Sequence, residues 1–312
     1  MKFVDPKNDL AFKKIFGDNN KTEILISLLN ALLNLPYDIV SITNMSPYQP
    51  PIIKVLKNSS LDIKAKDTTG REFVVEMQVE PNDNFGKRAL YYLAKAFVNQ
   101  IKIGEDYNEL KPAYFLGFLN FNLFKGNDYV TNHIFINQST GNQDLSFIEL
   151  NFVELKKFHK KEEELDNIID KWIFFMKNAT DLDHVPKSTT DQALLDAYDS
   201  ANQNQWSAIE LEAYEYRVKK HWDKINEART LENRHKDAER KLKEKVQKEK
   251  EKVQKEKRKA EVAENKAEVA ENKAEVAENK AEVANKKAEE EREKNKELLK
   301  EIELLRANNA NK

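Results

Sequence analysis

The sequence predicts a mixed α/β domain followed by a long α-helical tail. Residues 61–80 alternate between apolar and polar side chains on either side of a turn, which is typical of a β-hairpin. Residues 113–119 are almost all apolar, as in a strand that is covered on both faces of a sheet. No glycine follows Gly141 and no proline follows Pro186, so nothing from about residue 204 onward obliges a helix to end.

Composition indicates where the protein works and what it can bind. The 312 residues include no cysteine, which excludes disulfides and thiolate metal sites and is typical of a reducing cytoplasm. Residues 241–312 carry 21 basic and 18 acidic side chains, a net of +3, which leaves −5 for residues 1–240 from the total of −2. Any contact with nucleic acid must therefore be a local basic patch. With no signal peptide and no run of about 18 apolar residues, we expect a soluble cytoplasmic protein that does not enter a membrane.

The hairpin brings two carboxylates together if its turn has three residues. With residues 68–70 as the loop and Gly70 in the left-handed conformation, Asp62 lies opposite Glu76. Directly opposed residues have Cβ atoms about 5 Å apart, so these like charges repel unless a cation lies between them. A hard divalent metal ion is the usual solution. A two-residue turn would place the two carboxylates on opposite faces.

The remaining elements follow from apolar periodicity and from prolines that end them. The predicted order is helix, strand, hairpin, helix, strand. We expect helices from about residue 9, at 22–33, at 85–103 and at 164–177, and strands at 39–45, 113–119, 133–137 and 145–153. The corresponding domains are a globular domain at 1–180, a linker at 181–203 and a helical tail at 204–312.

The tail contains a seven-residue repeat at 246–294, which includes three consecutive copies of AEVAENK. With Ala260 at heptad position a, Ala263 occupies d, Glu264 occupies e and Lys266 occupies g. Because alanine buries little surface, this segment is either a weak coiled coil or a solvated single helix. The aromatic and branched residues of 206–225 are the better candidates for pairing, and we expect a homodimer through the tail.

A family resemblance rests on several motifs together. Asp62 and the Glu76-Met77-Gln78 run on the hairpin are followed by a helix that carries Lys87, Arg88, Tyr91 and Tyr92, and the chain opens with NDLAFKKIFG at 8–17. This combination resembles the PD-(D/E)XK nuclease superfamily, and within it the recombination-promoting nucleases, a group also named transposases. The resemblance covers roughly residues 1–240. It implies a restriction-endonuclease-like α-β-β-β-α-β core, DNA as substrate, and a link to recombination, mobile elements or phage defence.

The resemblance also implies a metal site. Asp62 and Glu76 would hold Mg²⁺ or Mn²⁺ with the backbone carbonyl of Met77. Asp9 is either a further acidic ligand or only the first residue of a helix. Gln78 stands where much of the superfamily has lysine, and its neutral amide can orient water only by hydrogen bonding. These residues form the predicted catalytic set: Asp62, Glu76, Gln78 and Asp9.

Basic and aromatic residues near this set are candidates for contact with DNA. Lys64 lies on the face of Asp62 and either supplies the missing positive charge or is an ordinary strand lysine. Lys87, Arg88 and Tyr92 either contact phosphate or belong to an ordinary amphipathic helix. The predicted function is a divalent-metal-dependent DNA endonuclease. The alternative is a degenerate nuclease fold that acts as a DNA-binding or oligomeric interaction module through its coiled tail.

Overall fold

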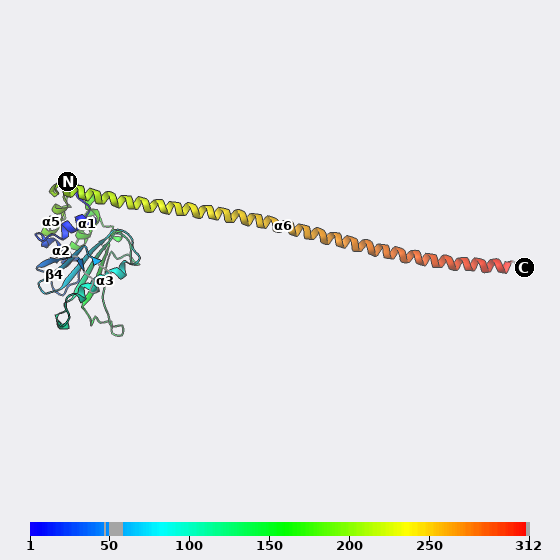
Figure 1. Cartoon of the computed structure of the whole chain (residues 1–312), viewed down its shortest axis with the longest axis horizontal. Helices are drawn as coiled ribbons and strands as arrows, with labels where there is room; N and C mark the ends of the chain where they lie inside the picture. Colours follow the sequence, from blue (N-terminus) through cyan, green and yellow to red (C-terminus); the bar gives the residue numbers. More distant parts are fainter. Residues whose placement is uncertain (47, 50–58, 310–312) are drawn as a thin grey trace. The chain divides into compact units, whose positions relative to one another are not determined.

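The computed structural model describes residues 1–46, 48–49 and 59–309 (Figure 1). The helices are α1 (Asp9–Phe16), α2 (Thr22–Leu32), α3 (Phe85–Val98), α4 (Ile168–Asn178), α5 (Gln192–Ala201) and α6 (Ala208–Asn309). The strands are β1 (Ile42–Met45), β2 (Tyr48–Gln49), β3 (Ser59–Ser60), β4 (Ile63–Asp67), β5 (Glu72–Gln78), β6 (Ala113–Leu119), β7 (Val130–His133) and β8 (Ile148–Glu154).

Six of these strands form one mixed sheet in the order β1-β4-β5-β6-β8-β7. The β5–β6 and β6–β8 pairs are parallel, and the other three pairs are antiparallel. Every residue of β6 is buried, as expected for a strand covered on both faces. From α2 to β6, apart from the short β2–β3 pair, the elements follow the predicted order of helix, strand, hairpin, helix and strand.

The hairpin of β4 and β5 has the predicted register. Lys64 pairs with Val74 and Ile63 with Val75, so the ladder continues to Asp62 opposite Glu76. Gly70 has a φ of +92°, a conformation that residues with a Cβ rarely adopt. The three-residue turn is therefore confirmed, and with it the position of the two carboxylates on one face.

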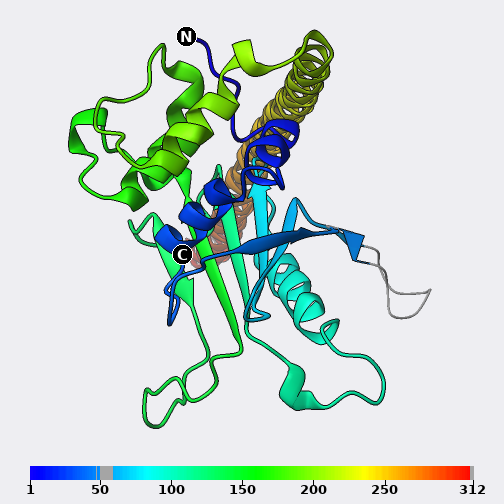
Figure 2. The ribbon, with the colours of Figure 1, turned by 90° about the vertical axis from the view of Figure 1, so that its left-hand side faces the viewer.

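Helices cover both faces of the sheet (Figure 2). On one face, Phe73 and Val75 of β5 join a core built with α1, α2, α4 and α5. On the other face, Val74 joins a smaller core with α3 and β8. Leu61 was predicted on the face of Ile63, but it packs in the smaller core because β4 begins only at Ile63 and the alternation does not extend to Leu61.

Some predicted boundaries are wrong. The strand predicted at 133–137 is β7, which ends at His133 because its ladder with β8 ends there, and the apolar residues that follow are exposed. Helix α3 ends at Val98, short of the predicted 103. The predicted linker at 181–203 contains α5, whose residues Leu194, Ala197, Tyr198 and Ala201 are buried at helical spacing.

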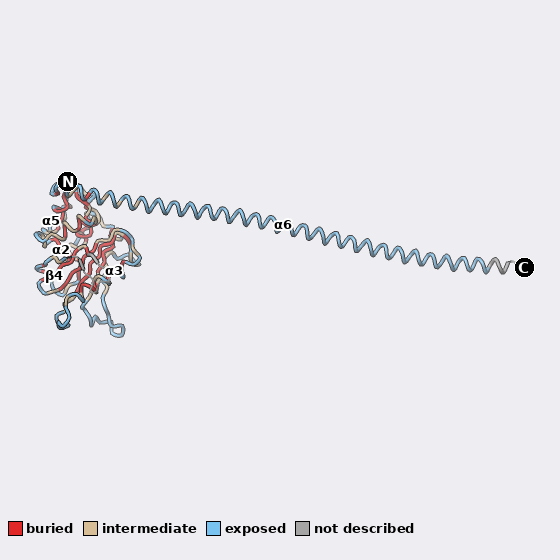
Figure 3. The backbone as a smooth tube through the Cα atoms, in the orientation of Figure 1, coloured by how far each residue is buried: buried red, intermediate tan, exposed pale blue. Residues whose placement is uncertain are grey.

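Helix α6 runs unbroken from Ala208 to Asn309, and the chain divides into two compact units at 1–224 and 225–312 (Figure 1). The first unit includes the opening turns of α6, and Tyr214 on these turns and Trp206 just before the helix are buried against the core. This corrects the prediction that these aromatic residues pair with a second chain. In the second unit, every described side chain from 226 to 304 is exposed (Figure 3). Within the described residues, no helix is long and apolar enough to span a membrane.

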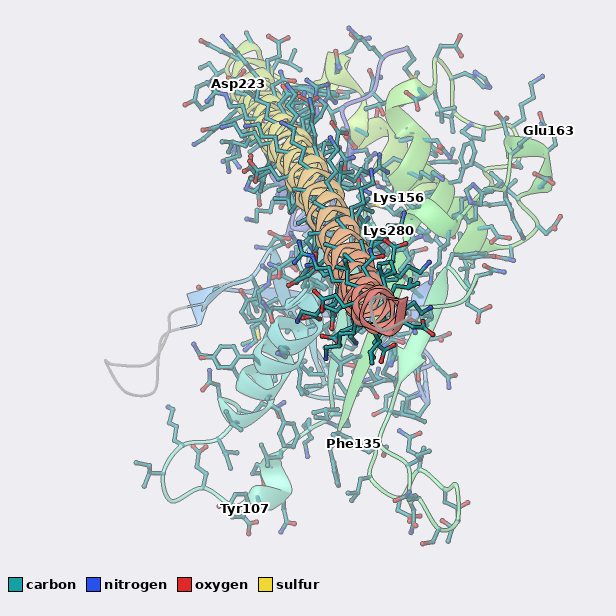
Figure 4. The ribbon with its side chains drawn as sticks, turned by 90° about the vertical axis from the view of Figure 1, so that its right-hand side faces the viewer. Tyr107, Phe135, Lys156, Glu163, Asp223 and Lys280 are labelled. Atoms are coloured by element: carbon teal, nitrogen blue, oxygen red, sulfur yellow. The ribbon has the colours of Figure 1, made fainter. Side chains whose placement is uncertain are left out.

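Two long loops lie at the end of the sheet where β5 begins, opposite its carboxyl end. They precede β6 and β8, which run parallel to β5. Tyr107 and Phe135 lie on these loops and are 81% and 52% exposed (Figure 4). These two loops therefore do not cover the opposite end of the sheet, where Glu76 and Gln78 lie.

Candidate active site

Two carboxylates and two backbone N–H groups join the strands of the hairpin at its open end. The backbone N–H of Asp62 donates to Oε1 of Glu76 at 3.0 Å. In return, the backbone N–H of Met77 donates to Oδ2 of Asp62 at 2.8 Å. Asp62 directly precedes β4 and Glu76 lies near the carboxyl end of β5, so the strand pairing itself positions both groups.

Burial controls the protonation of this pair. Burial, and then the negative charge of Asp62, raise the pKa of Glu76 to about 8. Burial also raises the pKa of Asp62, although the hydrogen bond from Met77 and the charge of Lys13 oppose that shift. The pair therefore retains a proton near neutral pH unless a further cation approaches it.

Helix α1 brings a lysine to the carboxylates. The side chain of Asn8 accepts backbone N–H groups of the first turn, so α1 begins at Asp9. One turn later, Nζ of Lys13 lies 2.6 Å from Oδ1 of Asp9 and 3.4 Å from Oδ1 of Asp62. Burial acts to raise the pKa of Asp9, but the hydrogen bond and charge of Lys13 outweigh it and the pKa is lowered. Asp9 is thus an ionised partner of Lys13.

The first turns of α6 lie beside α1 (Figure 2). Nη1 of Arg217 donates a hydrogen bond to Oδ2 of Asp9. Lys14 pairs with Glu210, and its Nζ lies 4.7 Å from the centre of the Trp206 ring. The contact between α1 and α6 therefore fixes Arg217 beside Asp9, although the two residues are 208 positions apart in the chain.

Helix α3 covers the other side of the site. Nη2 of Arg88 donates to Oε1 of Gln78, whose Nε2 donates to the backbone carbonyl of Glu80 at 2.8 Å. The guanidinium also lies 4.9 Å from the ring centre of Phe85. These contacts hold the Gln78 amide in one orientation and place Arg88 next to it.

Arg88 and Tyr92 on α3 lie close enough to Glu76 to interact with it electrostatically. Arg88 lies 5.8 Å from the ring centre of Tyr92, and its positive charge lowers the pKa of Glu76 without cancelling the effect of burial. Burial and then the charge of Glu76 raise the pKa of Tyr92. Among the described residues, the buried Nε of Arg88 has no hydrogen-bond partner. An anionic ligand at this point would satisfy that donor.

Two predicted contributors are placed differently. Nζ of Lys64 pairs with Oε2 of Glu72 at 2.8 Å, and both side chains are almost fully buried. Lys64 therefore neutralises Glu72 within the sheet, and the cation beside Asp62 is Lys13. Lys87 is exposed on α3, with no ion pair to either carboxylate in the described part of the chain.

The oxygens that fit a hard divalent cation are those of Asp62 and Glu76. Glu76 accepts from the backbone N–H of Asp62 and Asp62 accepts from that of Met77, while burial and then the charge of Asp62 raise the pKa of Glu76. Across the described residues, no group of three or more histidine or acidic side chains is arranged to hold a metal ion. Asp9 already binds Lys13 and Arg217, so a role as a metal ligand requires these contacts to open.

The fold is a mixed α/β domain whose central hairpin carries a carboxylate pair, with a lysine from α1 and an arginine from α3 beside it. A family model described as PD-(D/E)XK nuclease family transposase matches residues 6–231, and the chain belongs to this family. The match confirms the resemblance and includes the turns of α6 that carry Arg217. Comparisons with curated proteins and with solved structures gave no match.

Proposed function

We propose that the protein is a divalent-metal-dependent DNA endonuclease that hydrolyses phosphodiester bonds. The observation that carries this proposal is the Asp62–Glu76 pair, in which Glu76 accepts from the backbone N–H of Asp62, Asp62 accepts from that of Met77, and burial raises the pKa of Glu76 to about 8. Such a pair is a natural ligand set for Mg²⁺ or Mn²⁺. Membership of a nuclease family supports DNA as the substrate and a role in recombination, mobile elements or phage defence.

Each side chain of the site has a distinct proposed task. Asp62, Glu76 and the Met77 carbonyl would hold the cation, which when bound supplies Lewis-acid polarisation of the phosphate. Lys13 stabilises charge on the phosphate, which is the task of the lysine that much of the superfamily has at the position of Gln78.

The remaining contacts position these groups. The Gln78 amide, held by Arg88, orients the attacking water through hydrogen bonds. Arg88 donates to the phosphate through the nitrogen that lacks a partner. Asp9 keeps Lys13 charged. Burial acts to lower the pKa of Lys13, but the hydrogen bond to Asp9 and the charges of Asp62 and Asp9 outweigh burial, and the pKa is raised.

Plasmid cleavage tests the proposal. Purified protein should nick or linearise supercoiled plasmid in Mg²⁺ or Mn²⁺ and should lose this activity in EDTA. Asp62→Ala and Glu76→Gln should abolish cleavage, while Asp166→Ala and Glu163→Gln, at exposed positions, serve as matched controls. Wild-type protein that leaves the plasmid intact under all these conditions would contradict the proposal and favour the alternative, an interaction module with a nuclease fold.

A second copy of the chain is the partner that the repeats of α6 favour. Among the described residues of 260–281 no ion pair forms within the helix, whereas elsewhere along α6 pairs such as Lys236–Glu232 do form. In each AEVAENK repeat one glutamate stands at e and the lysine at g, where they face a partner helix, while the other glutamate stands at the outer position b. We therefore propose a weak parallel homodimer through these repeats, because a parallel arrangement brings Lys266 opposite a glutamate while an antiparallel one opposes like charges.

A further inference from the structure

The opening turns of α6 carry a basic stripe next to the active site. The stripe consists of Arg217, Lys220, His221 and Lys224, which lie on one side of the helix because three, four and seven residues span about one to two turns. All four residues line a hollow of about 840 Å³, and the one carboxylate in its lining is Glu212 at the N-terminal end. The lining of the hollow therefore carries the positive charges of Arg217, Lys220 and Lys224 against one carboxylate.

Two contacts connect this basic stripe to the catalytic groups. Arg217 binds Asp9, which in turn binds Lys13 beside Asp62. Nδ1 of His221 lies 3.4 Å from Oε1 of Glu80, and the backbone carbonyl of Glu80 accepts from Gln78. The stripe thus begins at the acidic end of the site and passes the end of β5.

We propose that the basic stripe binds the sugar-phosphate backbone of DNA on one side of the bond to be cut. This inference rests on the proposed nuclease function and names the surface that receives the substrate. From Arg217 to Lys224 the helix rises about 10.5 Å at 1.5 Å per residue. Phosphates of one strand follow at about 3.4 Å along a duplex, so the stripe spans roughly three nucleotides.

The donor chemistry fits phosphate. The guanidinium of Arg217 has five N–H donors, and Asp9 accepts from only one of its nitrogens, Nη1. The side chains of Lys220 and Lys224 are exposed. An acidic protein segment would also match the charge, but the stripe is connected through Asp9 and Lys13 to Asp62, where a phosphodiester has to arrive. Contacts of this kind position the substrate without reading its sequence.

DNA binding by the full-length protein tests the stripe without requiring cleavage. The measurement is fluorescence anisotropy of a labelled duplex in EDTA, as a function of salt concentration. Lys220→Gln and Lys224→Gln should each weaken binding several-fold and reduce the slope of log K against log salt by about 0.9. Lys219→Gln is the matched control, because its side chain lies about 100° around the helix from Lys220 and does not line the hollow.

A gain of affinity provides a second measurement that misfolding cannot imitate. Glu212→Gln removes the one carboxylate from the hollow and should tighten DNA binding at low salt. Equal affinities for wild type, Lys220→Gln, Lys224→Gln and Glu212→Gln would overturn the inference, as would the absence of DNA binding by the wild type. If the wild type binds through the stripe but cuts no plasmid, the nuclease proposal fails and the stripe stands.

Discussion

The Nζ atom of Lys13 lies 3.4 Å from Oδ1 of Asp62, which joins the first helix of the chain to the central hairpin. Much of the resembled superfamily carries a lysine two residues after the hairpin glutamate, where this chain has Gln78. The structure instead places an ammonium group beside the carboxylates from α1. A cation at this point can stabilise charge that develops on a bound phosphate.

Replacing Lys13 should therefore lower the cleavage rate strongly and change the stability of the fold little. We expect Lys13→Met to lower plasmid cleavage on the order of 100-fold, as for other single charged groups in preorganised sites. Lys13→Arg should recover part of the activity, and Lys2→Met, at an exposed position, should cleave like wild type. Cleavage rates at saturating DNA, with thermal unfolding as a check on folding, measure this. Full activity in a folded Lys13→Met protein would exclude Lys13 from the chemistry.

The raised pKa of Glu76 predicts a pH dependence of stability in the absence of metal. The folded state holds a proton that the unfolded state releases near 4.5, so the free energy of unfolding should fall as pH rises from about 4.5 to about 8. One proton contributes a slope of at most about 1.4 kcal/mol per pH unit. Chemical denaturation of Glu76→Gln, in which this group cannot ionise, should show a shallower decline than wild type. Identical slopes would show that Glu76 ionises normally.

Divalent metal should reverse that loss of stability. At a free concentration 100 times the Kd, binding to the folded state adds about 2.7 kcal/mol to the free energy of unfolding. We expect Mg²⁺ or Mn²⁺ to raise the Tm of wild type, and more so at pH 8 than at pH 6, because the cation displaces the proton of the carboxylate pair. Asp62→Ala and Glu76→Gln should lose the shift. Equal shifts in all three proteins would place the metal elsewhere.

Local pattern was sufficient to predict the hairpin and the pairing of its carboxylates. The register depends on one turn, and Gly70 at a positive φ is a feature that sequence alone can identify. The apolar run of β6 was likewise predicted with its true bounds. Helix α5 was missed, although Leu194, Ala197, Tyr198 and Ala201 show helical spacing, because the preceding proline suggested a linker.

The contacts that surround the carboxylates could not be predicted in the same way. Lys13 and Arg217 reach Asp9 from two helices whose packing depends on the whole fold. Lys64 shares the face of Asp62, but its partner depends on where Glu72 lies in the neighbouring strand. The sequence pattern predicts which face of a helix or strand a charged residue occupies, but the tertiary structure determines its partner.

The contact between Gln78 and Arg88 predicts how the site responds to a lysine at the superfamily position. Gln78→Ala should lower cleavage on the order of 100-fold, because the amide that orients water is lost. Gln78→Lys should also be impaired, because it places an ammonium next to the guanidinium of Arg88. The double variant Gln78→Lys with Arg88→Gln should recover activity relative to Gln78→Lys. Single-turnover cleavage distinguishes these cases, and a fully active Gln78→Ala protein would remove Gln78 from the mechanism.

The tail offers a test of association that leaves the active site intact. Deleting residues 260–287 removes four whole heptads and keeps the phase of α6. If these repeats form the parallel dimer, the deletion should convert a concentration-dependent dimer into a monomer in light scattering, while nicking by each active site is unchanged. Because Trp206 and Tyr214 belong to the core of the first unit, truncation before residue 206 should instead destabilise the fold.

Orientation can be measured directly because the chain has no cysteine of its own. In a parallel dimer in register, position a of one helix meets position a of the other, so Ala267→Cys should form a disulfide between chains under oxidising conditions. Asn265→Cys, at the outer position f, should cross-link far less. A full-length protein that stays monomeric at all concentrations would show that α6 is a single helix, stabilised along 232–252 by ion pairs between residues three and four positions apart.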